Sequence, residues 1–292
     1  MEHLSFYIVQ FLNGLTIGMT LFLIASGVTL ILGVLGLLNL CHGSFYMLGA
    51  FLAFTVCSGK WPAWFWISLF LAPTIAAIVG TLLEILFLRR IYNRERFYVL
   101  LFTFAWVLVF DDLVLNIWGR EFRSLSFPPG LGGSVQLWGK AFPIYFLFII
   151  FLGVAVILLL WALFYRTKLG LLIRACAQDS LMLNALGKNV SLIHTSVFAL
   201  GTWLAALGGV VAAPLRSISA GMGLEMVIES FIVVVIGGMG SIPGALIGAL
   251  LIGQIRSFGI LILPQYAMIL IYILLAGMLI VRPRGIFGYG AN

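Results

Sequence analysis

The chain has 292 residues, of which 63% are hydrophobic and only 9% charged, and its net charge is +7. A soluble domain carries roughly 25% charged residues, so this composition excludes a soluble globular protein. The apolar runs are continuous and do not alternate in segments of roughly ten residues, which excludes a transmembrane β-barrel. We therefore predict an all-α membrane protein, a polytopic helical bundle that forms a single transmembrane domain over residues 1–292.

The positive charge does not indicate nucleic acid as a partner, because its distribution follows the positive-inside rule of membrane proteins. Basic residues cluster in two loops and directly after the last apolar run. We place these clusters on the cytoplasmic side of a multi-pass protein in the lipid of a bacterial inner membrane. They comprise Arg89, Arg90, Arg94, Arg96, Arg166, Lys168, Arg174, Lys188, Arg282 and Arg284.

The first apolar run extends from about residue 5 to residue 58, longer than the roughly 20 residues of one span. We expect a span over 6–26 and two half-helices over 27–38 and 44–57. Polar, non-helical backbone survives at membrane depth only where protein buries it or where it lines a water-filled cavity. The polar interruption is therefore predicted to line a solute pathway, through Asn39, His42, Ser44 and Tyr46. The alternative is that His42 only satisfies backbone carbonyls freed at the break.

Three further spans are expected over 63–88, 97–118 and 142–165. The loop 91–96 between the first two is short, basic and cytoplasmic. Residues 119–141 form the longest periplasmic loop, with Pro and Gly turn signals. Lys60-Trp61-Pro62 is expected to form an interfacial turn, because tryptophan prefers the headgroup level. Glu84 stands about one turn from Arg89 and is expected to reach the interface there.

Residues 166–190 form the one extended hydrophilic segment. Helical spacing over 173–187 places Ala177, Leu181 and Ala185 on one apolar face, and Gly187 follows as a stop signal. We expect one short amphipathic helix on the cytoplasmic face.

A second interruption, Gly237 to Gly244, lies in the last third of the chain. We expect a span over 191–213, an outer loop over 214–223, half-helices over 224–236 and 245–255, and a last span over 264–281. About eight membrane segments result. Paired Gly/Pro interruptions in the two halves of a membrane protein point to a transport site. The pathway residues predicted at this interruption are Gly238, Met239, Gly240 and Ser241.

Two arrangements of the broken segments remain open. If both segments are re-entrant, they enter and leave the membrane on the outside. Every basic cluster then lies inside, and both termini are cytoplasmic. If both segments cross the membrane fully, the N-terminus, Arg282 and Arg284 lie outside, against the positive-inside rule. We prefer re-entrance. The order of span, broken element and inward span at 6–88 recurs at 191–281, which is a weak internal repeat.

These residues also resemble a known family. Three ordered motifs are similar to those of LivH-type permeases, the branched-chain amino acid subunits of ABC importers. The motifs are Leu38-Asn39-Leu40-Cys41-His42-Gly43-Ser44 with Gly49-Ala50, Arg174-Ala175-Cys176-Ala177-Gln178-Asp179 with Leu186-Gly187, and Ile236-Gly237-Gly238-Met239-Gly240-Ser241-Ile242-Pro243-Gly244-Ala245.

The resemblance implies a permease that passes a small polar solute received from a periplasmic solute-binding protein. It implies as partners a LivM-type second permease and two cytoplasmic ATPase subunits. Substrates across the family include branched-chain and other amino acids, urea, short amides and aromatic acids, and the resemblance does not choose among them. It also implies a segment that couples to the ATPases, with Arg174, Ala175, Ala177, Gln178, Asp179, Leu186 and Gly187.

Glu229 and Arg256 depart from the family pattern, in which a basic or neutral residue and a glutamate are frequent at the two positions. We expect an ion pair with its signs exchanged.

No catalytic residue, metal site or cofactor is predicted in the chain itself. It contains no Gly-rich phosphate-binding loop ending in Lys and Ser or Thr, so ATP and magnesium are expected on partner subunits. The alternative classes are an ion-coupled secondary transporter or channel, which should carry a carboxylate at mid-depth, and a membrane enzyme. His42 has no neighbour in sequence with which to build a catalytic dyad.

Overall fold

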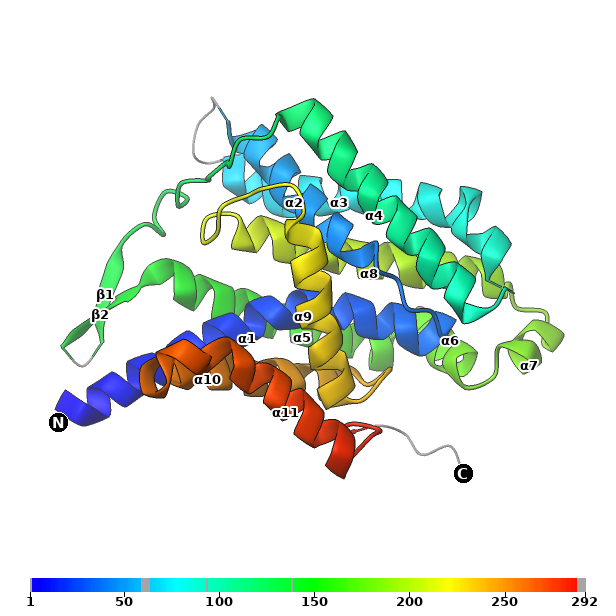
Figure 1. Ribbon diagram of the computed structural model, residues 1–292. Helices are drawn as coiled ribbons and strands as arrows, with labels where there is room; N and C mark the ends of the chain where they lie inside the picture. Colours follow the sequence, from blue (N-terminus) through cyan, green and yellow to red (C-terminus); the bar gives the residue numbers. More distant parts are fainter. Residues whose placement is uncertain (1, 59–63, 93, 138, 288–292) are drawn as a thin grey trace.

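The computed structural model describes residues 2–58, 64–92, 94–137 and 139–287, so the predicted turn at Lys60-Trp61-Pro62 lies outside the described residues. The described chain is an all-α bundle, as predicted, and it also carries one small β-hairpin (Figure 1). Its elements are α1 (Glu2–Leu35), α2 (His42–Cys57), α3 (Trp64–Leu86), η1 (Leu88–Ile91), α4 (Arg96–Trp118), β1 (Ser134–Leu137), β2 (Lys140–Pro143), α5 (Ile144–Arg166), α6 (Lys168–Gln178), α7 (Ser180–Ala185), α8 (Val190–Ala212), α9 (Met222–Gly237), α10 (Ile242–Ile262), η2 (Pro264–Tyr266) and α11 (Ala267–Val281).

Six of the described helices are long and apolar enough to cross a membrane: α1, α3, α4, α5, α8 and α10. Two shorter apolar segments, His42–Cys57 and Ile269–Val281, accompany them. The helices α1 and α8 are mostly buried inside the protein, whereas α4 and α5 are mostly exposed. The centre of the bundle is therefore α1 and α8, with α2, α3 and α10 packed against them.

Helix α1 differs from the expectation of a span followed by a half-helix. It continues without interruption for 34 residues, about 51 Å at 1.5 Å per residue. Gly27 and Gly33 do not break it. They let other backbones approach, because a Cβ at Gly27 would meet the carbonyl of Gly201 and one at Gly33 would meet the Cα of Gly240.

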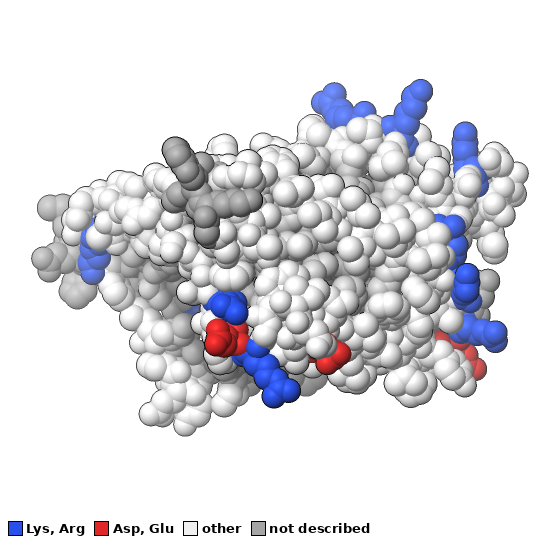
Figure 2. Space-filling view, turned by 90° about the horizontal axis from the view of Figure 1, so that it is seen from above, with Lys and Arg blue, Asp and Glu red and all other residues white. Residues whose placement is uncertain are grey.

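The two ends of the bundle differ in what they carry. The first turns of α1 lie at the hairpin end, where the Lys140 ammonium is 4.6 Å from the Phe6 ring centroid. Helices α6 and α7 lie at the opposite end, which we call the basic end (Figure 1). Most of the Lys and Arg side chains visible from above gather toward this end (Figure 2).

Helix α11 ends away from the start of α1. It is followed by Gly285, which lies against Gly238, and the neighbouring Gly240 lies against Gly33 near the C-terminal end of α1. The start of α1 and the end of α11 therefore lie toward opposite ends of the described bundle, which differs from the expectation that both termini share one side.

The first interruption occupies residues 36–41, after which α2 begins inside the bundle. The second occupies only 238–241. Helix α10 is then a full span of 21 residues, longer than the expected half-helix over 245–255. It runs antiparallel to α1, with Gly253 against Gly14 and Gly18.

Two loops carry structure that the sequence did not predict. The outer loop contains the antiparallel pair β1–β2, in which Ser134 faces Pro143. The cytoplasmic segment is not one helix over 173–187 but two, because Asp179 leaves the helical conformation and its Oδ1 caps α7 by accepting from Met182 N at 2.9 Å. Gly187 does end α7, with a φ of 76°.

The placement of the termini can be tested by cysteine labelling. In a background with Cys41, Cys57 and Cys176 replaced by alanine, we expect Tyr7→Cys and Lys140→Cys to react with a membrane-impermeant maleimide from one side. Lys188→Cys and Arg284→Cys should react only from the other side, and permeabilised membranes should label all four. Labelling of Tyr7→Cys together with Lys188→Cys would contradict the fold described above.

Candidate functional site

The first interruption places His42 in the middle of the bundle. After Leu35 the chain runs back along α1, so that His42 Nε2 lies 3.2 Å from the carbonyl oxygen of Ile24. The imidazole is fully buried and lies against Gly27, where a Cβ would collide with it. The sequence alternative in which His42 satisfies a backbone carbonyl thus applies to one ring nitrogen.

Several polar atoms around this interruption are buried without a hydrogen-bond partner among the described residues. They are His42 Nδ1, both side-chain polar atoms of Asn39, and the hydroxyls of Thr29, Ser44 and Tyr46. Each such group costs roughly 1–3 kcal/mol relative to a satisfied one. Most of these unpartnered groups belong to the first interruption and to the first turns of α2.

Asn39 and His42 border a gap together with Val28, Ile31 and Leu37. The gap is too narrow to admit a water molecule. Ser44 is also buried, one turn into α2. The structure therefore brings Asn39, His42, Ser44 and Tyr46 to one region of the bundle interior, where the polar groups meet a closed seam.

The N-terminal ends of α2 and α9 meet beside this seam. A Cβ at Gly43 would overlap the carbonyl of Gly223, and one at Gly223 would meet Gly43. Helix N-termini carry a partial positive charge and unpaired N–H groups. Two such ends converge here, and the described buried residues at this point include no Lys or Arg.

The second interruption is a tight turn near the basic end. Gly238 and Gly240 adopt φ values of 106° and 82°, which side chains rarely tolerate. Ser241 is buried and caps α10 by accepting from Gly244 N at 3.1 Å, whereas Met239 is 59% exposed. Gly240 and His42 contact α1 six residues apart, at Gly33 and Gly27, about 9 Å along its axis.

The predicted coupling residues lie at the basic end. Thr167 caps α6 by accepting from Gly170 N at 3.0 Å, and the Arg174 guanidinium lies 5.0 Å from the Tyr165 ring centroid. Ala175 is half-buried, and the remaining predicted residues are exposed: Ala177, Gln178, Asp179, Leu186 and Gly187.

The buried face of this segment is not the expected one. Ile173, Cys176 and Leu183 pack inward, and Leu181 and Ala185 face outward. Leu181, Met182 and Leu186 are exposed by 82%, 63% and 68%. These three side chains form an exposed apolar surface among the described residues, on a helix that lies at the edge of the bundle (Figure 1).

Glu229 and Arg256 form an ion pair between α9 and α10, with Arg256 Nη1 3.1 Å and 3.3 Å from the two carboxylate oxygens. Both side chains are about one fifth exposed. The pair joins the half-helix to the neighbouring span.

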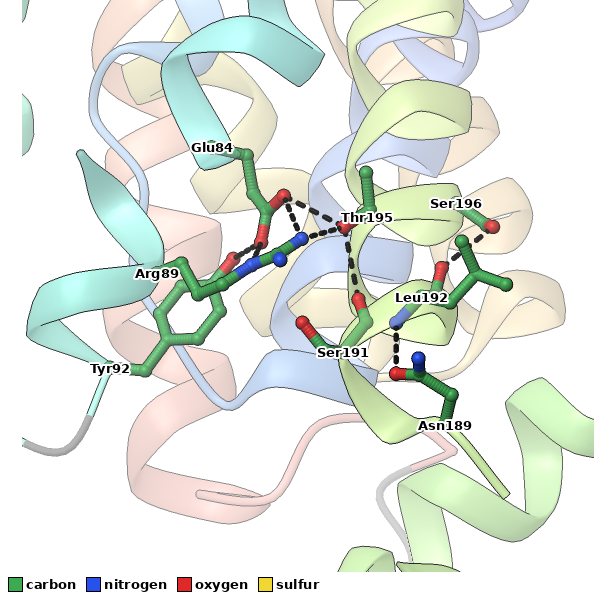
Figure 3. Close-up of polar contacts among 8 residues, drawn as sticks. All are labelled: Glu84, Arg89, Tyr92, Asn189, Ser191, Leu192, Thr195 and Ser196. Atoms are coloured by element: carbon green, nitrogen blue, oxygen red, sulfur yellow. Dashed lines mark hydrogen bonds and ion pairs between the residues drawn. The ribbon is translucent and has the colours of Figure 1, made fainter. Parts of the chain in front are cut away.

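A second polar network, which the sequence did not reveal, centres on Glu84 at the basic end (Figure 3). Its carboxylate is fully buried and accepts from Arg89 Nε at 3.3 Å and Nη2 at 3.2 Å, from the Tyr92 hydroxyl at 2.9 Å and from the Thr195 hydroxyl at 2.8 Å. Burial and the neighbouring carboxylate raise the pKa of Tyr92, so that its hydroxyl stays a donor.

This Glu84 network joins the end of α3 to the start of α8. Thr195 lies in the second turn of α8, and Asn189 caps the helix by accepting from Leu192 N at 3.1 Å (Figure 3). From the sequence, Glu84 was expected only to reach the interface near Arg89, but its side chain is fully buried. Its contact with Thr195 was not predictable, because Thr195 lies 111 residues away. In the described part of the chain, no group of three or more His, Cys, Asp or Glu residues is placed to hold a metal ion.

Comparison with known proteins gives a consistent result. Residues 10–279 match the family described as branched-chain amino acid transport system permease component. The chain is 30% identical to the high-affinity branched-chain amino acid transport system permease protein BraD of Pseudomonas aeruginosa, over 99% of this chain and 98% of the relative.

The chain is also 29% identical to LivH of Escherichia coli K12, over 98% and 97% of the two chains. LivM of the same organism is 24% identical over 93% of this chain and 68% of that relative. No solved structure matches.

Removal of the Glu84 carboxylate should destabilise the fold. Glu84→Ala leaves the Tyr92 and Thr195 hydroxyls without their acceptor and removes the ion pair of Arg89, whose side chain is 37% exposed, so the loss should be roughly 1–3 kcal/mol. The measurement is thermal unfolding of the purified protein in detergent. The control is Glu121→Ala, because Glu121 is 81% exposed in its pair with Arg123 and should cost roughly 0–1 kcal/mol. Equal transition temperatures for the two variants would contradict the role assigned to Glu84.

Proposed function

The chain belongs to the permease family of branched-chain amino acid transport systems, and we propose that it is the membrane-spanning subunit of an ATP-driven importer for a branched-chain amino acid. The observation that carries the proposal is the match of residues 10–279, which includes both interruptions and the cytoplasmic segment. The full-length likeness to BraD supports the same conclusion.

The geometry supports a solute pathway along α2. Polar groups of Asn39, His42 and Tyr46 are buried without partners, and the N-terminal ends of α2 and α9 meet beside them. Helix N-termini favour a carboxylate, and backbone carbonyls near the break offer acceptors to an ammonium. The seam at Asn39 is closed, so passage requires α2, α9 or α1 to move. In this proposal Gly238 to Ser241 form the hinge of the pathway near its inner end.

We place the basic end in the cytoplasm and the hairpin end in the periplasm, in accordance with the positive-inside rule. The N-terminus is then periplasmic. The proposed partners follow from these sides: a periplasmic solute-binding protein at the hairpin end, two ATPase subunits at the basic end, and a LivM-type permease beside the bundle. The chain's likeness to both LivH and LivM supports a pair of related permeases.

Coupling to the ATPases is proposed for α6 and α7. The exposed surface formed by Leu181, Met182 and Leu186 at the basic end supports this role, because an apolar patch beyond the membrane end needs a protein to cover it. Asp179 separates the two helices and fixes the angle at which this surface is presented. ATP and magnesium belong to the partner subunits in this proposal.

Reconstitution tests the proposed function. The permease pair, the ATPases and the cognate binding protein are placed in vesicles, and uptake of labelled L-leucine is measured. We expect uptake to require ATP hydrolysis and to persist when ion gradients are collapsed. Leu181→Asp should reduce uptake at least tenfold while the permease remains folded, because it places a charge in the proposed ATPase contact.

The matched control is Leu181→Met, which keeps the apolar surface and should retain uptake. Leucine uptake driven by an ion gradient without ATP would replace the proposal by a secondary transporter. Full uptake by Leu181→Asp would remove α7 from the coupling contact.

A second prediction concerns the buried seam. Asn39→Leu removes two unpartnered polar atoms at nearly constant size, so the thermal stability should be unchanged or higher. Uptake should fall at least tenfold, because the seam loses its polar lining. Ser26→Ala is the control, since the Ser26 hydroxyl is buried but already bonded to Leu23 O at 2.9 Å. Unchanged uptake in Asn39→Leu would exclude Asn39 from the pathway.

A further inference from the structure

A cavity of about 280 Å³ opens between the loop before α9 and the first turns of that helix. At about 30 Å³ for each water-sized group, it holds a molecule of roughly nine non-hydrogen atoms. Its lining consists of Arg216, Ser217, Ser219, Ala220, Gly221, Met222, Glu225 and Met226. None of these residues was predicted as a site from the sequence.

The cavity carries one charge of each sign, and the two do not neutralise each other. The ion pairs within the described residues are Glu84–Arg89, Glu121–Arg123 and Glu229–Arg256, so neither Arg216 nor Glu225 has a partner among them. The Arg216 guanidinium is half-buried and donates only to Met226 Sδ, at 3.1 Å. A half-buried guanidinium without an anion is ready to bind a carboxylate.

The loop that carries Arg216 is held in place from two sides. Arg123 and Ile218 exchange backbone hydrogen bonds of 2.9 Å and 2.8 Å, and Gly221 N donates to Asp111 Oδ1 at 3.3 Å. The two charged residues are therefore presented by a fixed loop and a helix, which is a condition for selective binding.

The cavity lies beside the start of α2. Gly223, between the cavity residues Met222 and Glu225 in the first turn of α9, lies against Gly43 at the start of α2. Tyr46, one turn further along α2, has a fully buried hydroxyl without a partner among the described residues. The cavity and the first interruption thus adjoin the same contact between α2 and α9.

We propose that this cavity is an outer binding site for a zwitterionic α-amino acid, with Arg216 binding the carboxylate, Glu225 binding the ammonium, and Met222 and Met226 contacting an apolar side chain. The inference rests on the proposed transport of an amino acid. It adds a site in this chain that receives the solute before the closed seam. Methionine adapts to side chains of different shape. The site therefore selects a ligand by its carboxylate and ammonium groups more than by the shape of its side chain.

Protection from labelling tests the site directly. Ser217→Cys is introduced into the variant with Cys41, Cys57 and Cys176 replaced by alanine, in the assembled transporter without ATP. We expect L-leucine to slow maleimide labelling of the cavity cysteine. The matched probes are 4-methylpentanoate, which lacks the ammonium, and 3-methylbutylamine, which lacks the carboxylate. Each should need at least a tenfold higher concentration than leucine.

Arg216→Gln and Glu225→Gln should each raise the leucine concentration for half protection at least tenfold. Arg120→Gln and Glu121→Gln, exposed and outside the cavity, should leave it unchanged. Absence of protection by leucine, equal protection by the three probes, or unchanged protection in Arg216→Gln would overturn the site. If ATP-driven leucine uptake persists in that case, the proposed function stands without it. Protection without any ATP-driven uptake would support the site and refute the proposed function.

Discussion

Inside a membrane, every backbone N–H and C=O must find a partner or lie against protein or water, because each unpaired group costs several kcal/mol in lipid. Residues 36–41 break this pairing after α1. The polar positions of this segment lie inside the bundle: Asn39 is buried, and the Leu40 N–H donates to the Thr103 hydroxyl of α4 at 3.3 Å. The apolar Leu38 is instead 42% exposed, and His42 lies against a carbonyl of α1. This enclosure of the polar groups makes a polar interior possible in a chain with so few charges.

Small residues allow the helices around this segment to approach closely. At Gly27 and Gly201 the backbones of α1 and α8 approach so closely that a Cβ on Gly27 would collide with a carbonyl. Gly43 and Gly223 do the same for the starts of α2 and α9. Helices in membranes associate through such packing because lipid offers no hydrophobic force between them. These glycines therefore serve mainly to let helices pack closely, and they do not interrupt the helices that contain them.

The difference between a glycine that packs and a glycine that breaks a helix explains which parts of the fold could be predicted. Apolar runs and polar interruptions located the spans and both breaks, because length and hydropathy are set locally by the bilayer. The continuity of α1 through Gly27 and Gly33 was missed, because a glycine that packs and a glycine that breaks look the same in a sequence. The expectation that both termini share one side rested on the same assumed break in α1.

The contact partners of individual side chains could not be predicted from the sequence. Glu84 and Thr195, or Arg216 and the first turns of α9, meet only after the chain has folded. The polar residues of the first break were predictable as a group because they are adjacent in the chain. Which of their atoms remain unpartnered depends on α1, which supplies a carbonyl for one nitrogen of His42 and for none of the Asn39 side-chain atoms.

Helix α8 links the proposed coupling segment to the proposed pathway. Its start is held by the Asn189 cap and by the Glu84 network, directly after α7. Six residues beyond Thr195, about 9 Å along the helix, Gly201 lies against Gly27 where the His42 ring packs. In the proposed coupling, a displacement of α7 that shifts the start of α8 would act at the Gly27–Gly201 contact. Because a close-packed interior transmits strain and absorbs little of it, the seam at Asn39 lies within reach of such a movement through a single rigid element.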